Sequence, residues 1–164
     1  MESVMNFSSL YQVSEIELVY KTKIKVSERP KIKSSSDAYE IFKQSWDDNK
    51  IEFVEQFKVM LLNRANKVLG IYEVSTGGIS GTVADIRLIF AATLKTNSSS
   101  LILAHNHPSS NTKPSDADIQ LTRKIKEAGK LMDIKVEAPI KLTTSGRGKL
   151  TTCFAGEDSV VQVC

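Results

Sequence analysis

The chain of 164 residues, with a mass of 18.2 kDa, is long enough to form one domain with a buried core and a short appendage. Its 41% hydrophobic and 25% charged residues are typical of a globular protein, and no apolar run approaches the roughly 20 residues that cross a membrane. The net charge of +3 is compatible with nucleic-acid binding but does not indicate it, and the N-terminus lacks the pattern of a signal peptide.

The first 33 residues are predicted to form an N-terminal strand or arm. Residues 16–26 alternate in the manner of a strand, and Pro30 then disfavours helix in the residue before it. One face of this strand would carry the basic side chains Lys21, Lys23 and Lys25. We expect this segment to be either an added edge strand or a partner-binding arm, followed by the compact domain over residues 34–164.

Eight further elements follow from capping residues and hydrophobic periodicity. Helices are expected at about 37–46, 84–95 and 115–130, and strands at about 52–62, 67–74, 100–104, 133–143 and 149–154. Ser34 to Ser36 offer N-caps for the first helix, and Asn63-Arg-Ala-Asn66 is a turn-like linker between the first two strands. Strands that alternate with helices predict an α/β or mixed α+β fold, with a central sheet flanked by helices.

Both histidines of the chain lie two residues apart, directly after the predicted buried strand 100–104. Side chains at positions i and i+2 of a strand point to the same side, so the imidazoles of His105 and His107 can converge on one point. Two imidazoles suit zinc, which needs a third protein ligand and, in catalytic sites, keeps one position for water.

Asp118 is the candidate third ligand. It lies one turn inside the helix that Ser115 is predicted to cap, in line with an apolar stripe of Leu121, Ile125 and Ala128. A carboxylate on a buried stripe is costly unless it is paired or bound to a cation. The alternative is that Ser115 and Asp118 form a capping box and merely satisfy backbone donors at the start of the helix.

The combined pattern H-x-H-x(7)-S-x-x-D, at residues 105–118, resembles that of JAMM (JAB/MPN) metalloproteins. The string HNHPSSNTKPSDADIQLT is similar to the bacterial RadC branch, long labelled a DNA-repair protein, as are FKVMLLNRANKVLG, STGGISGT and KEAGKLMDI. The resemblance covers about residue 37 to Asp133, and more loosely extends to Phe154. It implies a JAB/MPN, cytidine-deaminase-like architecture. The chain is most similar to the short RadC-like proteins of Bacteroides-type mobile elements, without a helix-hairpin-helix region.

This resemblance also implies roles for the candidate site residues. Zinc would be held by His105, His107 and Asp118, with water as the fourth ligand. In JAMM peptidases an upstream glutamate is the general base, and a motif serine helps to stabilise the tetrahedral intermediate. Ser115 matches that serine by its place in the motif.

The general base lies outside the dense motif, and Glu55 is its leading candidate. It precedes the strand QFKVMLL where the family has its acid, and alternation places it on one face with Phe53 and Phe57. Glu52 and Glu73 remain open as candidates. The alternative for Glu55 is an acid at a strand end that faces solvent.

The sequence departs from the RadC pattern in one place that bears on activity. Where that branch usually has Leu-Asp-His-x-Ile, residues 137–140 read Glu-Ala-Pro-Ile, so Ala138-Pro139 replaces the Asp-His pair. If the missing pair supports a ligand or faces substrate, its loss typically costs about 10- to 100-fold in affinity or activity. A reduced activity is therefore one expected outcome.

The sequence thus predicts a zinc-dependent, metallopeptidase-like hydrolase of the JAMM type, in which water attacks an amide or isopeptide bond of a peptide or protein substrate. The alternative is a DNA-associated repair or mobile-element factor, either a nuclease or a DNA-binding module, with a structural or vestigial metal site. The intact motif argues against a metal-free structural module. The two cysteines, Cys153 and Cys164, are too few for a disulfide scaffold and fit a cytoplasmic location without membrane contact.

Overall fold

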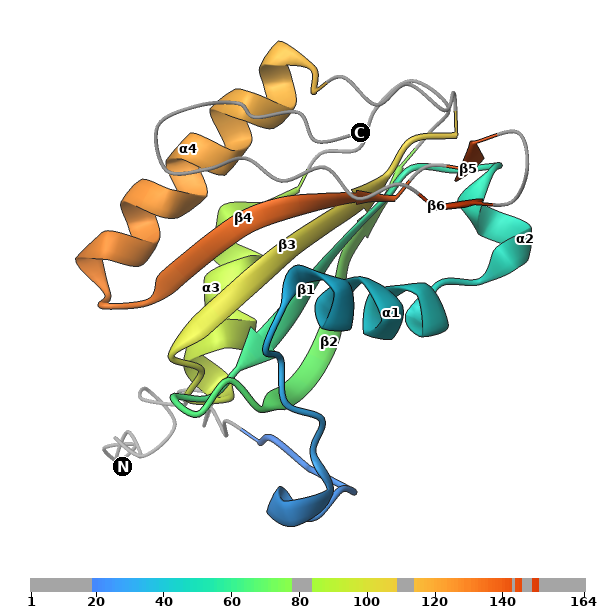
Figure 1. Cartoon of the computed structure of the whole chain (residues 1–164). Helices are drawn as coiled ribbons and strands as arrows, with labels where there is room; N and C mark the ends of the chain where they lie inside the picture. The colour runs from blue at the N-terminus through green and yellow to red at the C-terminus, as the bar shows by residue number, and fades with distance from the viewer. Residues whose placement is uncertain (1–18, 78–83, 109–113, 143, 146–148, 151–164) are drawn as a thin grey trace, which may run out of the picture.

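A four-stranded mixed sheet lies between two layers of helices in the computed structural model (Figure 1), which describes residues 19–77, 84–108, 114–142, 144–145 and 149–150. The strands of the sheet are β1 (Gln56–Leu62), β2 (Val68–Thr76), β3 (Ser100–Asn106) and β4 (Lys135–Leu142). Their spatial order is β2-β1-β3-β4, where β1 runs antiparallel to both neighbours and β3 runs parallel to β4. A short pair, β5 (Thr144–Ser145) and β6 (Lys149–Leu150), follows.

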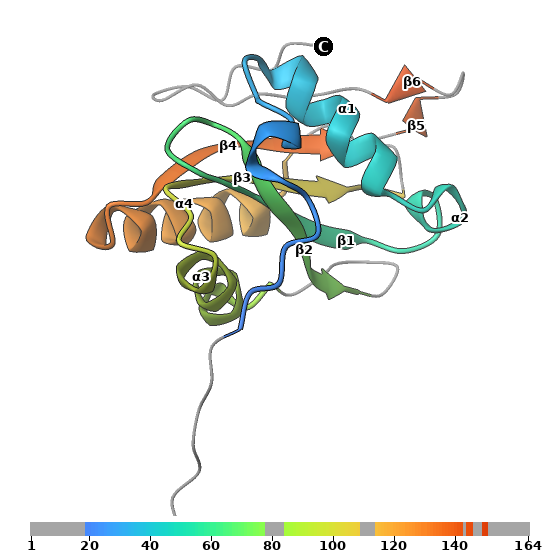
Figure 2. The ribbon, with the colours of Figure 1, turned by 90° about the horizontal axis from the view of Figure 1, so that it is seen from below.

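The helices cover both faces of this sheet. They are α1 (Ser35–Ser45), α2 (Asp48–Ile51), α3 (Ile86–Lys95) and α4 (Asp116–Leu131). Figure 2 shows α1 on one face, and α3 and α4 together on the other. The predicted mixed α+β fold with a central mixed sheet and flanking helices is therefore confirmed.

The parity of residues in β1 and β3 decides which helical layer each side chain meets. Both strands are buried at all seven positions, which explains their continuous apolar sequence. The α1 layer packs on even-numbered residues, among them Met60, Leu62, Ile102 and Ala104. The layer of α3 and α4 packs on odd-numbered residues, among them Phe57, Val59, Leu61, Leu101 and Leu103. Any residue that continues these strands is assigned to a face by the same rule.

Most predicted elements occur within a few residues of their expected bounds, but two expectations were wrong. The first strand was expected from residue 52, whereas Asp47 caps the short helix α2 and β1 starts only at Gln56. The strand predicted over 16–26 is absent from its described part, residues 19–26, which is irregular and enters a 3₁₀ turn. Alternation forms a strand only where a neighbouring strand supplies hydrogen bonds. The predicted strand residues beyond Leu150, with Cys153, lie outside the described residues.

The end of the predicted arm contacts the domain. Lys31 pairs with Lys67 in an isolated bridge, and Ile32 is buried against the α1 layer. Lys21, Lys23 and Lys25 are exposed. In the part of the chain that the structure describes, no helix combines the length and the hydropathy that crossing a bilayer requires.

Gly129 allows α4 to approach the start of β4. A Cβ atom built there would lie 2.7 Å from the Ile134 carbonyl oxygen and 2.7 Å from Val136 Cγ2, which is closer than real contacts allow. We expect Gly129→Ala to lower the free energy of unfolding by about 1–3 kcal/mol, although alanine is the better helix former. Denaturant unfolding measures this change. Gly70→Ala in β2 is the control, because no atom lies within 4 Å of its added Cβ. A Gly129→Ala protein as stable as the control would contradict the prediction.

Candidate metal centre

Strand β3 delivers both histidines to the face of the sheet that α3 and α4 cover. His105 is the sixth of its seven residues, and the ladder with β4 continues through a hydrogen bond from the His107 backbone N–H to the Leu142 carbonyl, at 3.1 Å. The His105 ring is stacked on Phe57, its partner in β1, with ring centroids 6.1 Å apart. Both imidazoles are buried, so their placement is fixed by the core of the domain.

Helix α4 brings the carboxylate of Asp118 to the same place. Ser115 caps the helix by accepting a hydrogen bond from the Asp118 backbone N–H at 3.1 Å. In return, Asp118 Oδ2 accepts one from the Ser115 backbone N–H at 2.9 Å. Ser115 and Asp118 therefore form a capping box, and the predicted stripe of Leu121, Ile125 and Ala128 packs against the sheet. The same carboxylate turns toward the histidines.

The three side chains form a group that could hold a metal ion. Their ligand atoms all lie within 4.8 Å of one another. His105 Nε2 and His107 Nε2 are 2.8 Å apart, and each lies 3.6 Å from Asp118 Oδ2. Ligands about 2 Å from a tetrahedral zinc lie about 3.3 Å from one another. The observed distances lie on both sides of this value, and two imidazoles with a carboxylate are a donor set that zinc accepts. The residues therefore fit the ion.

The electrostatics of Asp118 favour a bound cation. Burial by itself would raise the pKa of this carboxyl, but the two imidazoles and the Ser115 backbone N–H outweigh burial. The pKa of Asp118 therefore lies below its ordinary value, and the group stays ionised at neutral pH. A negative charge in a half-buried position is stabilised by a positive partner, which a metal ion supplies.

The chain has a second capping box, in α1, with the same residue spacing but with no histidine beside it. In α1, Ser34 caps the helix and Asp37 returns the hydrogen bond, which repeats the S-x-x-D spacing. Asp37 there accepts from the backbone N–H groups of Lys33 and Ser34. Hydrogen bonds from those two groups hold the pKa of Asp37 below its ordinary value. The two boxes therefore share the reciprocal serine–aspartate hydrogen bonds and differ in their surroundings.

The matched boxes make the role of Ser115 testable. We expect Ser115→Ala to lower the free energy of unfolding of the metal-free protein by about 1 kcal/mol, because the Asp118 N–H loses its acceptor. It should also weaken zinc affinity by about 10-fold or more, since the first turn of α4, which carries the Asp118 carboxylate, loses the side-chain cap that fixes its backbone. Denaturant unfolding and competition with a chromophoric chelator measure the two effects. Ser34→Ala should cost similar stability and leave zinc affinity unchanged. Equal zinc affinities in the two variants would contradict the prediction.

The three candidate bases lie in different places, and none belongs to the group that could hold a metal. Glu55 directly precedes β1, and its carbonyl accepts a hydrogen bond from the Gly77 N–H at 2.8 Å. Its odd number gives it the same parity as Phe57 and the other β1 residues on the face of the two histidines. Glu52 is exposed at the C-terminal end of α2.

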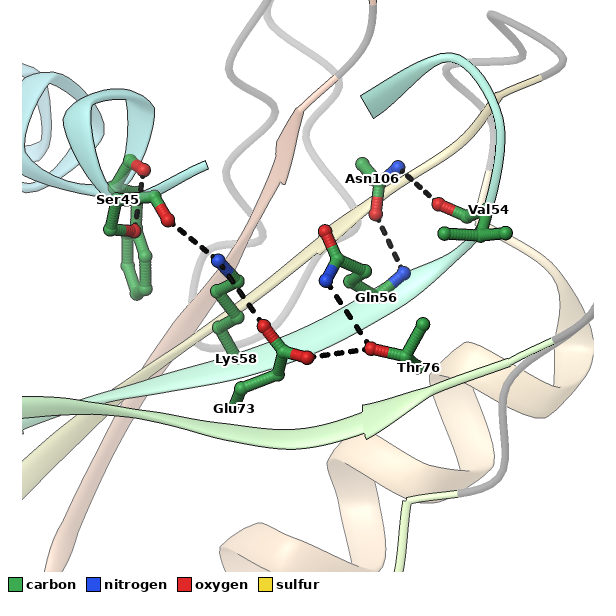
Figure 3. A network of polar contacts seen from close by, with 8 residues as sticks. Ser45, Val54, Gln56, Lys58, Glu73, Thr76 and Asn106 are labelled. Carbon is green, nitrogen blue, oxygen red and sulfur yellow. Dashed lines mark hydrogen bonds and ion pairs between the residues drawn. The ribbon is translucent and has the colours of Figure 1, made fainter. Parts of the chain in front are cut away.

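Glu73 is held on the opposite face of the sheet, toward α1 (Figure 3). It accepts a hydrogen bond from the Thr76 hydroxyl at 2.6 Å and forms an ion pair with Lys58, 3.5 Å away. Lys58 Nζ in turn donates to the Ser45 carbonyl and lies 4.4 Å from the centre of the Trp46 ring. The Thr76 hydroxyl, with Lys58, lowers the pKa of Glu73. Its location and charge therefore both make Glu73 a poor candidate for the base.

Sequence reasoning missed Asn106, the residue between the two histidines. It is completely buried and faces α1, and its side chain bonds to the segment that runs from the end of α2 to the start of β1 (Figure 3). Its carbonyl oxygen accepts from the Gln56 N–H at 2.7 Å, and its amide donates to the Ile51 and Val54 carbonyls at 2.7 and 2.8 Å. A polar residue inside a buried strand must find hydrogen-bond partners, so the sequence indicates that Asn106 is bonded but not to which residues.

The replaced Asp-His pair coincides with an irregularity in β4. Ile102 pairs with Glu137, but Ala104 pairs with Ile140, so one extra residue is inserted between them in β4. Pro139 has no backbone N–H to give to the ladder, and proline is tolerated in an edge strand such as β4 and at an irregularity of this kind. The departure therefore lies opposite Leu103, two residues before His105.

The comparison with protein families agrees with this geometry. The model of the RadC-like JAB domain matches residues 32–144, so the chain belongs to the RadC-like JAB domain family. The family resemblance of the sequence is confirmed.

Curated relatives support the same assignment. UPF0758 proteins of Flavobacterium johnsoniae, Porphyromonas gingivalis and Thermosynechococcus vestitus are 44%, 42% and 45% identical over 106, 82 and 82 residues. The matches cover 65%, 50% and 50% of this chain, but only 45%, 36% and 33% of those proteins. The chain thus matches less than half the length of these relatives, whose names state no reaction or partner.

Proposed function

We propose that the chain is a zinc-dependent hydrolase that cleaves an amide or isopeptide bond in a peptide or protein. The observation that carries the proposal is the convergence of two imidazole nitrogens and one carboxylate within 4.8 Å, in a member of the RadC-like JAB family. His105, His107 and Asp118 would hold the ion, which leaves one position of a tetrahedron for water. When bound, zinc polarises the scissile carbonyl and makes water nucleophilic at neutral pH.

The remaining chemistry falls to Glu55 and Ser115 in this proposal. Glu55 would accept the proton of the attacking water and pass it to the leaving nitrogen. Of the three candidate glutamates, Glu55 is the one that directly precedes β1 and has the parity of the histidine face. The pKa of Asp118, held low by its surroundings, keeps that carboxylate available as a ligand, so the two acids have separate tasks.

Ser115 can serve the reaction without giving up its cap. Its oxygen accepts the hydrogen bond from the Asp118 N–H, and a hydroxyl still has one hydrogen to donate. Ser115 is exposed, so a substrate can reach that hydrogen. We assign to it a hydrogen bond to the oxygen that becomes negative as water adds to the carbonyl, a contact that strengthens in the transition state.

The experiment that tests the proposal has two steps. Elemental analysis of protein purified without chelator, or reloaded with zinc, is expected to find about one zinc per chain. A cleavage screen with amide- and isopeptide-linked substrates should then find hydrolysis that a chelator removes and zinc restores. Protein that neither retains nor takes up zinc would refute the metal site. A zinc-loaded protein that cleaves nothing in the screen would leave a structural ion and count against the hydrolase.

The alternative of a DNA-associated factor rests on the RadC label and on no residue of the chain, and its test uses the basic side chains of Lys21, Lys23 and Lys25. These side chains are exposed, but residues 19–26 form no strand that would align them on one face. Micromolar, salt-dependent DNA binding that is lost when the three lysines are changed to glutamine would favour this function over the hydrolase.

A further inference from the structure

The Asn106 side chain forms hydrogen bonds to the backbone on both sides of Glu55. The Asn106 side chain binds Val54 and Gln56, the two residues on either side of Glu55, and also binds the end of α2 through Ile51. Its backbone meanwhile lies between the two histidines. One residue therefore connects the H-x-H strand with the backbone on each side of the proposed base.

A primary amide can satisfy all three backbone groups that Asn106 contacts, which are two carbonyls and one N–H. The Ile51 and Val54 carbonyls need donors, the Gln56 N–H needs an acceptor, and a buried amide offers two donor hydrogens and an acceptor oxygen. Aspartate supplies the acceptor alone, and an apolar side chain supplies none of the three. Asn106 is 0% exposed, so water cannot replace the lost bonds without opening the core.

Neighbouring residues of a strand point to opposite faces of the sheet, so Asn106 can hold the backbone beside Glu55 from the face opposite to the metal ligands. Asn106 and Gln56 turn toward α1, whereas His105 and Phe57 turn the other way and stack on each other. A hydrogen bond at Gln56 N–H fixes the start of β1 without blocking the face of the imidazoles. The Glu55 carbonyl is tied as well, to Gly77, so the backbone at this residue is held from two sides.

We infer that Asn106 is a positioning residue, which holds Glu55 at a fixed distance from the ion bound by His105, His107 and Asp118. The inference rests on the proposed function for the identity of the base and of the ion. It predicts that Asn106 is needed for the placement of one short segment and not for metal binding.

Cobalt(II) in place of zinc gives a direct readout of that placement. Its pseudocontact shifts in NMR spectra depend on the distance and direction from the ion to each backbone amide. We expect Asn106→Ala to bind cobalt like the wild type, to lose most of the shift at Val54, Glu55 and Gln56, and to retain the shifts of amides in α3. Turnover on a substrate found in the screen should fall as it does in Glu55→Gln, with no further loss in the double variant.

Two further variants keep the test decisive. Asn106→Asp has the same shape and keeps the acceptor for Gln56, so it should alter the shift at Val54 more than the shift at Gln56, even if Asn106→Ala does not fold. Gln56→Met removes a buried polar side chain that donates to Thr76, and should leave the shifts at residues 54 and 55 unchanged. Cobalt-loaded Asn106 variants with wild-type shifts at residues 54–56 would overturn the inference alone. A wild-type chain that binds no cobalt or zinc would overturn the proposed function as well.

Discussion

The His107→Ala protein is expected to contain no zinc, where the wild type holds about one ion per chain. Without His107, one imidazole and one carboxylate remain, and two ligands bind zinc far more weakly than three. Zinc adds stability to the folded state in proportion to the logarithm of its concentration over Kd, about 2.7 kcal/mol at one hundred times Kd. Elemental analysis and melting curves with and without zinc measure both effects. The variant should lose the zinc-dependent rise in Tm that the wild type shows.

A substitution at Asp116, two residues before the proposed ligand Asp118, is the matched control for Asp118→Ala. Asp116 stands on the same first turn of α4 and is exposed, outside the group of three. Asp118→Ala should lose zinc as His107→Ala does, whereas Asp116→Ala should keep it, although both remove one negative charge from the start of the helix. Zinc retained in Asp118→Ala, or lost equally in the two aspartate variants, would show that charge near the helix and not ligation explains the binding.

The sheet and its helices could be predicted because local signals agreed with the tertiary arrangement. β1 and β3 are buried on both faces, so their apolar runs identify them as strands even without alternation. Ser34 and Ser115 cap the helices where the sequence indicated. The prediction at residues 16–26 was wrong over its described part because an alternating pattern does not say whether a neighbouring strand is present. The Tyr20 hydroxyl instead donates to the Leu69 carbonyl of β2.

The convergence of the three candidate ligands was predictable from the sequence, but the hydrogen bonds of Asn106 to the segment around Glu55 were not. H-x-H after a buried strand places two imidazoles on one face by the period of the strand alone. Among the described residues, a capping box with S-x-x-D spacing forms at Ser34 and at Ser115, and only the second box faces histidines. Spacing within a helix therefore cannot tell a cap from a ligand. Asn106 escaped notice because its partners lie about 50 residues away, where no local pattern records them.

Glu55→Gln is expected to keep zinc and to lose hydrolysis by about 10²- to 10⁴-fold, the contribution of a positioned general base. Glutamine has nearly the same shape and can still form hydrogen bonds, but its amide cannot take a proton from water at neutral pH. The ligand group does not include Glu55, so the ion and its stabilising effect should remain. Zinc content, Tm and the kcat of the substrate found in the screen together separate this loss from that in Asp118→Ala.

Glu73→Gln is the control, because it removes a carboxylate of the same chemistry from the opposite face of the sheet. Glu73 is occupied by Lys58 and Thr76, and its lowered pKa makes it a weaker base, so kcat should stay near that of the wild type. Its loss should instead reduce stability, since it leaves the ammonium group of Lys58, largely buried between β1 and α1, without its counter-ion. Full activity in Glu55→Gln with loss in Glu73→Gln would move the base across the sheet. Full activity in both would assign the proton transfer to Glu52 or remove a glutamate base from the mechanism.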